Sequence, residues 1–98
     1  MADEVPSTFT VYPNYPNPFN PSTDLRYDLS VGSFVHAAVY DISGRLIKTL
    51  GSSQQTAGKK TINWSGTNDK GDAVSGGIYF CVIEAGNARQ VLKMMLVK

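Results

Sequence analysis

Four of the chain's five prolines fall within ten residues, Tyr12 to Pro21, a segment that we call the strap. Each proline fixes its own φ, lacks a backbone N–H donor and pushes the preceding residue toward extended backbone. The strap is therefore predicted to be stiff, extended and punctuated by turns, and it cannot be a central strand of a sheet. Its asparagines are expected to bond to nearby backbone, and Tyr15 and Phe19 to pin it onto a neighbouring surface.

Length and composition indicate one small domain. The chain has 98 residues, 42% of them hydrophobic, and its nine basic residues leave a net charge of +1. A chain of this length buries about two-thirds of its unfolded surface, which supports one core but leaves little free energy for a deep catalytic cleft. The basic residues form no arginine-rich block and no RNA-binding aromatic motif, so we expect no nucleic-acid partner.

The N-terminus is predicted to differ from the rest of the chain. Residues 1–7 are expected to be disordered or a linker, and residues 8–98 to form the domain. The first residues lack the basic start and apolar run of a secretory signal peptide. No apolar run approaches the roughly 20 residues that a membrane helix needs. As given, the chain is expected to be a soluble domain.

Short β-branched and aromatic segments recur between clusters of Gly, Asn, Asp and Ser, while helix signals are nearly absent. This spacing predicts an all-β fold, a seven-stranded immunoglobulin-like antiparallel β-sandwich. The expected strands are residues 8–12, 23–29, 34–40, 46–50, 60–65, 78–83 and 89–98, with a polar loop over 51–58.

Period-two alternation identifies the side chains that should form the core. The segment 78–83 is apolar at nearly every position, which places it in the middle of a sheet. Trp64 is expected to fill the centre of the sandwich. The other inward side chains are predicted to be Leu25, Tyr27, Leu29, Val35, Ala37, Val39, Ile62, Leu92, Met94 and Leu96. A hairpin turn is expected at 41–44, with Gly44 supplying positive φ.

The residue inventory offers little for catalysis. With one histidine and one cysteine, the chain can form neither an intrachain disulfide nor a cysteine-based zinc site, and no G-x-S-x-G or H-E-x-x-H motif occurs. His36 is expected on a surface and Cys81 among buried hydrophobic side chains. The sequence therefore predicts a protein that is not an enzyme and that has no catalytic residues, cofactor or metal.

Two weaker signals point to ligands. Residues 68–72 cluster Asn and Asp oxygens but lack the alternating ligands and distal glutamate of a calcium loop, so a turn is favoured and calcium stays open. Exposed tyrosines of a small sandwich can stack on sugar rings. The candidates are Tyr12, Tyr15, Tyr40 and Tyr79, for which packing within strands or strap is the favoured interpretation.

The order of several motifs resembles that of a known family. These motifs are YPNPFNPST at 15–23, LRYDL at 25–29, VYDISGR at 39–45, NWSG at 63–66, DKG at 69–71, GGIYF at 76–80 and KMMLVK at 93–98. Together they resemble the C-terminal sorting domain, type A, of the bacterial type IX secretion system. The resemblance covers the chain from Tyr12 to its end. The same consensus overlaps with the immunoglobulin-like domain of the flagellar hook-capping protein.

The resemblance implies a non-catalytic address label. Such a label directs a fused upstream cargo protein of a Bacteroidetes-like bacterium through the periplasm and the outer-membrane translocon to the cell surface, where a sortase can remove the label. The implied partners are that translocon, the surface sortase and the cargo domain, with no small-molecule substrate. By the same resemblance, translocon recognition falls on Pro16, Asn17, Pro18, Gly77, Tyr79, Lys93 and Lys98.

Two other functions stay open on the sequence. One is a structural domain of a flagellar hook-capping protein, and the other is an accessory carbohydrate-binding module of a secreted glycosidase. For the sorting role, the final strand is expected at or near a sheet edge, where it can offer backbone pairing and a basic tip to a receptor.

Overall fold

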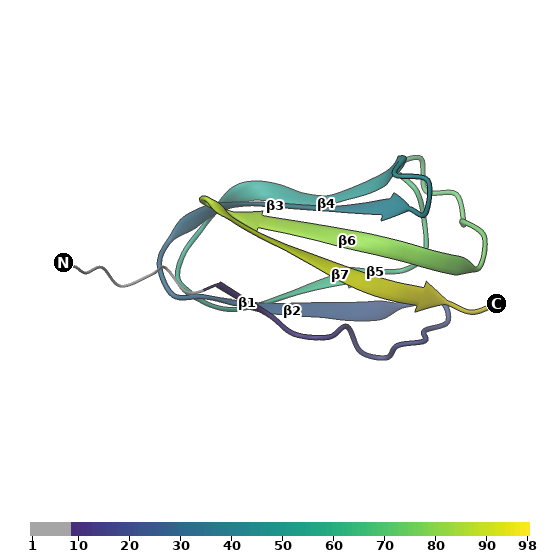
Figure 1. The fold of residues 1–98 in the computed structure, drawn as a ribbon, viewed down its shortest axis with the longest axis horizontal. Helices are drawn as coiled ribbons and strands as arrows, with labels where there is room; N and C mark the ends of the chain where they lie inside the picture. Colours follow the sequence, from purple (N-terminus) through teal and green to yellow (C-terminus); the bar gives the residue numbers. More distant parts are fainter. Residues whose placement is uncertain (1–8) are drawn as a thin grey trace.

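A computed structural model describes residues 9–98. Its seven strands form two antiparallel sheets packed face to face, which confirms the predicted sandwich (Figure 1). The three-stranded sheet has the order β1-β2-β5, from Phe9–Val11, Thr23–Leu29 and Gly58–Trp64. The four-stranded sheet has the order β4-β3-β6-β7, from Leu46–Gln55, Ser33–Asp41, Gly77–Ala85 and Ala88–Leu96.

The predicted N-terminal segment 1–7, and Thr8 at the start of the first predicted strand, lie outside the described residues. Within 9–98, no helix is long and apolar enough to cross a membrane. β6 lies between β3 and β7, as its apolar sequence predicted, and β7 is an edge strand.

The core forms where the inward positions of the two sheets meet. Trp64 is fully buried, as predicted, and its indole N–H donates to the carbonyl of Thr67 at 2.9 Å. The ring of Phe19 lies 5.6 Å from that of Trp64, and the ring of Tyr79 lies 5.2 Å away at 70°. The rest of the buried cluster is Phe9, Leu25, Tyr27, Leu29, Val35, Ala37, Val39, Cys81, Ile83, Ala85, Met94 and Leu96. Ile62 and Leu92, also predicted inward, are partly buried against it.

The polar loop predicted at 51–58 is wrong. β4 continues to Gln55, and its second half pairs with β3 from Ser33↔Gln55 to Ala37↔Gly51. This half carries glycine, serine and glutamine, so hydrophobic alternation could not identify it. Backbone pairing with β3 extends the strand instead, and Gln55 accepts a hydrogen bond from the Tyr27 hydroxyl at 2.7 Å.

The turn between β3 and β4 is held by one carboxylate. Asp41 Oδ1 accepts hydrogen bonds from the Ser43 hydroxyl at 2.6 Å and from the N–H groups of Ser43 and Arg45 at 2.9 and 3.0 Å. Gly44 has φ 89°, which confirms the positive φ expected there. The Ser43 hydroxyl above all, followed by the Arg45 N–H, lowers the pKa of Asp41 below its ordinary value of 3.8.

Replacing this carboxylate is expected to remove a pH-dependent contribution to stability. Because the pKa is lower in the folded state, the ionised Asp41 stabilises the fold above the unfolded value of 3.8. This contribution is lost as the pH falls through the folded pKa. Asp41→Asn should therefore be less stable than wild type at neutral pH, and the difference should shrink as the pH falls below 3.8 and through the folded pKa. Urea unfolding of both proteins across this range measures it; a difference independent of pH would contradict the assignment.

Candidate recognition site along the strap and β7

The strap pairs with the edge of β7 and so extends the four-stranded sheet. The Phe19 N–H donates to the Met95 carbonyl at 3.0 Å, and the Val97 N–H donates to the Phe19 carbonyl at 2.9 Å. The Met95 N–H donates to the side-chain Oδ1 of Asn17 at 3.0 Å. Phe19 thus forms a parallel β-bridge with Leu96 at the C-terminal end of β7. The outward backbone groups of Met95 and Val97 are already hydrogen-bonded to the strap.

The two aromatic side chains expected to pin the strap behave differently. Phe19 is 2% exposed and packs on Trp64, as predicted. Tyr15 is 72% exposed, so the prediction that it pins the strap is wrong. Its backbone explains this: Tyr15 exchanges hydrogen bonds of 3.0 and 2.9 Å with Asp24 of β2, and that bridge holds the strap while the ring stays in solvent.

Buried polar groups fix the middle of the strap. The Thr23 hydroxyl donates to the Pro16 carbonyl at 2.8 Å. The Asn14 amide donates to the Thr23 hydroxyl at 3.0 Å and to the Pro16 carbonyl at 3.3 Å. Asn14 and Thr23 are only 3% and 1% exposed, so these bonds hold the strap at a fixed distance from β2. The expected local bonding is confirmed for Asn14, whereas Asn17 instead contacts the distant strand β7.

The structure brings several of the predicted recognition residues together. Asn17, Pro18 and Lys93 line one shallow pocket of about 310 Å³ with Met94 and Met95. The backbone carbonyl of Pro16 carries the polar anchor described above. The strap and the second half of β7 therefore present a single exposed surface.

Gly77 and Lys98, two of the predicted recognition residues, lie at the same end of the four-stranded sheet, where β6 begins and β7 ends. Gly77 pairs with Leu96 and has φ 151°, which favours glycine. The neighbouring Gly76 approaches the backbone so closely that a Cβ would lie 3.2 Å from the Leu96 carbonyl oxygen and 3.6 Å from the Lys98 nitrogen. Lys98 is exposed just beyond β7.

Tyr79 occupies a different environment from the other predicted residues. It lies opposite Met94 on β6, but its side chain is 6% exposed and its ring meets Trp64 edge-on. Its hydroxyl donates to the Ser75 carbonyl at 2.6 Å, and burial raises the pKa of Tyr79. The side chain therefore connects β6 to the loop that precedes it, and little of its surface is accessible to a partner.

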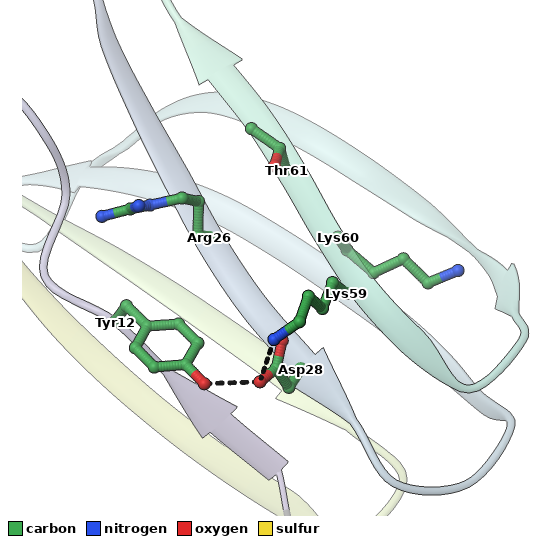
Figure 2. A pocket seen from close by; sticks show the side chains of 6 residues that line it. All are labelled: Tyr12, Arg26, Asp28, Lys59, Lys60 and Thr61. Carbon is green, nitrogen blue, oxygen red and sulfur yellow. Dashed lines mark hydrogen bonds and ion pairs between the residues drawn. The ribbon is translucent and has the colours of Figure 1, made fainter.

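A second cluster lies on the outer face of the three-stranded sheet, where a pocket of about 350 Å³ is lined by Tyr12, Arg26, Asp28, Lys59, Lys60 and Thr61. Figure 2 shows Tyr12 and Lys59 converging on Asp28 from opposite sides. The Tyr12 hydroxyl donates to the Asp28 carboxylate, which raises the pKa of Tyr12, and Lys59 Nζ lies 3.6 Å from the same carboxylate. Tyr12 begins the strap just after β1, Asp28 lies on β2 and Lys59 on β5, so the cluster ties the start of the strap to these two strands.

The four tyrosines considered for sugar stacking do not form one platform. Tyr12 borders the three-stranded sheet and Tyr15 belongs to the strap. Tyr40 lies on β3 of the other sheet, and Tyr79 is buried. A flat array of aromatic rings, which a polysaccharide surface would require, is therefore not built from these side chains.

The remaining chemical candidates have structural roles. Cys81 is buried, as expected, and burial raises the pKa of its thiol to about 12. The Asn68 side chain accepts the N–H groups of Lys70 and Asp72 at 2.9 and 3.0 Å, and the Asp69 carboxylate accepts the Thr49 N–H at 3.0 Å. These oxygens organise a turn, and in residues 9–98 no three His, Cys, Asp or Glu side chains gather as a metal site.

Comparison with known families agrees with this geometry. The model of the FlgD Ig-like domain family matches residues 23–89, more than half of the chain. The chain belongs to this family. A comparison with curated proteins gave no match.

Several solved structures have a fold similar to that of this FlgD Ig-like domain. Dimeric latent PorU from Porphyromonas gingivalis matches 99% of the chain at 23% identity with a TM-score of 0.72. PorZ from the same organism, described as a component of its type-IX secretion system, matches 90% of the chain at 20% identity with a TM-score of 0.60. FlgD from Pseudomonas aeruginosa matches 96% of the chain at 18% identity with a TM-score of 0.60. The chain covers 10% of PorU, 11% of PorZ and 74% of FlgD, and these identities establish the shared fold alone.

Some residues that build the site were not identified from the sequence. Asn14 and Thr23 are buried polar partners, and the Tyr12–Asp28 bond links segments sixteen residues apart. The alternation that predicted Leu25, Tyr27 and Leu29 to point inward also leaves Arg26 and Asp28 on the outer face, which was the available signal for the second cluster. Nothing local in the sequence indicates which side chain meets them.

Proposed function

We propose that this domain is a non-catalytic sorting module that directs a fused cargo protein through a type IX translocon to the outer-membrane surface. The observation that carries the proposal is the strap–β7 junction. Asn17 and Phe19 are hydrogen-bonded to β7 on the same side of the molecule as Lys93, so the proline motif and the basic strand form one ordered surface. A receptor can recognise such a preorganised surface without paying to order it.

The structural relatives support a module of this kind. The whole chain corresponds to about a tenth of PorU and of PorZ, which is the size of an appended domain within a much longer protein. PorZ is described as an essential bacterial surface component of the type-IX secretion system. In our proposal the partners are the translocon, a surface sortase and the upstream cargo, and the route leads through the periplasm to the cell surface.

The strap determines where a receptor strand could pair. It occupies the edge of β7 at Met95 and Val97. Because alternate residues of a strand direct their backbone groups to the same edge, Val91 and Lys93 also present theirs outward. The described residues make no further backbone hydrogen bond to that part of the edge. As far as residues 9–98 are concerned, strand addition to β7, as in β-augmentation, is possible at Val91 and Lys93 and ends at the strap.

The test is export of a reporter. The full 98-residue chain, placed behind a signal peptide and a fluorescent protein, is expressed in a host with a type IX system. We expect the reporter at the cell surface or in the medium. Lys93→Glu together with Lys98→Glu should leave it in the periplasm, because both positions are exposed and the substitutions reverse the charge of the proposed surface.

Lys70→Glu is the matched control. Lys70 is exposed in the 67–72 turn, its side chain lies outside the strap–β7 surface, and the substitution changes charge by the same amount per site. Circular dichroism and urea unfolding of each variant separate a recognition defect from misfolding. Deleting Met94 to Lys98 is a poorer test, because Met94 and Leu96 belong to the core. Retention of the wild-type reporter in the periplasm, or equal export of all variants, would refute the sorting role.

A structural role in a flagellar hook cap is the second candidate, and the family match favours it. Under this role the domain would not export a fused reporter. It would instead assemble with flagellar hook components, which co-purification from a flagellated host would reveal.

A further inference from the structure

The two sheets differ in what they turn toward solvent. On the three-stranded sheet the outward side chains are polar: Thr10, Arg26, Asp28, Lys59, Thr61 and Asn63. The four-stranded sheet carries apolar side chains outward on β3, β6 and β7. We call this set, Tyr40, Ile78, Phe80, Val82, Val91 and Met95, the outer apolar face. Antiparallel sheets with a solvated outer face normally alternate apolar and polar residues, as the first sheet does and the second does not.

The strand register makes the outer apolar face continuous. Tyr40 lies opposite Phe80, Val82 lies opposite Val91, and Ile78 lies opposite Met95. Val91 and Met95 are 57% and 41% exposed, whereas the other members are half-buried. A groove of about 440 Å³ crosses this face, and its lining combines apolar side chains with one carboxylate and one arginine: Tyr40, Asp41, Ile42, Gly44, Phe80, Val82, Arg89 and Val91. Contiguous apolar surface of this kind on a small protein marks an interaction site.

The charges around the face are not balanced. Lys93 lies opposite Phe80, within the apolar rows, and among residues 9–98 no carboxylate is within ion-pair distance of it. Glu84 lies directly opposite Arg89, and Asp41 pairs with Arg45 at 3.4 Å. Glu84 and Asp41 thus each lie beside an arginine, whereas among residues 9–98 Lys93 has no carboxylate partner and is available to one from outside.

We propose that the outer apolar face docks a protein partner that presents apolar side chains beside a carboxylate. A second copy of this chain, docked through the same face, fits less well, because Glu84 and Asp41 of that face lie beside arginines and Lys93 would be buried without a counter-charge. A protein also fits better than a lipid surface, since the open edge of β7 at Val91 and Lys93 offers backbone groups that only another polypeptide can pair along its length. The inference does not depend on the sorting role.

A pair of synthetic peptides tests the proposal. One alternates valine with glutamate over eight residues, and the other has lysine in place of glutamate. We expect the glutamate peptide to bind the 98-residue chain at least about tenfold more tightly at low salt, and the difference to shrink as salt is added. Amide chemical shifts should change along β6 and β7 and not along β2 or β5.

Two valine-to-threonine variants, one on the outer apolar face and one outside it, test whether the peptide binds at this face. Val91→Thr should weaken binding of the glutamate peptide several-fold, because it places a hydroxyl in the lining of the groove. Val31→Thr makes the same substitution at a residue that is 51% exposed outside the face, and it should leave binding unchanged.

Four results would overturn the proposal. Equal binding of the two peptides, or insensitivity to Val91→Thr, would remove the acidic protein partner. Concentration-dependent dimerisation that Val91→Thr abolishes, measured by sedimentation, would make a second copy the occupant. Sedimentation with anionic phospholipid vesicles that depends on Val91 would make a membrane the occupant. None of these measurements involves export, so the docking face and the sorting role stand or fall separately.

Discussion

Trp64→Ala is expected to lower the free energy of unfolding by about 3–5 kcal/mol, the cost of removing a fully buried large aromatic side chain. Trp64 is 0% exposed, and the rings of Phe19 and Tyr79 pack on it from the strap and from β6. A small domain has about 5–15 kcal/mol of stability in total, so this loss approaches the limit of folding. Urea unfolding followed by circular dichroism measures it.

Two further substitutions define what Trp64 contributes. Trp64→Phe keeps an aromatic ring but loses the hydrogen bond to the Thr67 carbonyl, so the loss should be clearly smaller. Phe34→Ala is the control on an aromatic that is 54% exposed, where we expect a change within about 0.5 kcal/mol. Equal losses from Trp64→Ala and Phe34→Ala would contradict the central position of Trp64.

Phe19→Ala is expected to cost about 3–5 kcal/mol as well and, in addition, to release the strap from β7. Phe19 is the side chain that anchors the strap in the core, and its backbone makes both main-chain bonds to Met95 and Val97. Loss of the anchor should therefore expose the amides of Met95 and Val97, which donate to the strap. Hydrogen exchange by NMR should show faster exchange at these two amides than at those facing β6.

Tyr15→Ala is the matched control within the strap. Tyr15 is 72% exposed, so its removal should change stability by no more than about 0.5 kcal/mol and leave both amides protected. A double-mutant cycle of Phe19→Ala and Trp64→Ala should give a coupling energy of about 0.5–1.5 kcal/mol, as for other aromatic pairs in contact. Additive losses without coupling would show that the two rings do not stabilise each other.

These results bear on recognition as well as on stability. If the strap is released, Asn17 and Pro18 no longer lie against β7 beside Lys93. Phe19→Ala should then impair any function that depends on the strap–β7 surface although Phe19 itself is buried. The strap is thus a structural element of the sheet whose outer side is the candidate recognition site.

Much of the fold followed from local patterns. Alternation in residues 23–29 predicted the bounds of β2 and its buried face, because a half-buried strand repeats every two residues. The continuous apolar run at 78–83 predicted the central position of β6. Gly44 predicted the turn, because few other residues adopt its backbone conformation.

Other features had no local signal. The second half of β4 is polar, and only its partner β3 makes it a strand. Asn17 and Met95 are in contact although 78 positions separate them in the sequence, so no local pattern near either residue predicts the contact. Of the two aromatic residues that were expected to pin the strap, Phe19 is buried against Trp64 and Tyr15 is exposed, and only their contacts with distant strands distinguish them.

The sequence by itself determined that the strap is proline-rich, rigid and unable to be a central strand, since φ restriction and missing donors act within single residues. It also determined the seven-stranded sandwich, since side-chain periodicity is a local property. Only the tertiary structure decided that the strap occupies the C-terminal end of the β7 edge and that, within residues 9–98, the four-stranded sheet turns an apolar face outward. Both depend on which strands become neighbours, and that is set by burial summed over the whole core and not by any one segment.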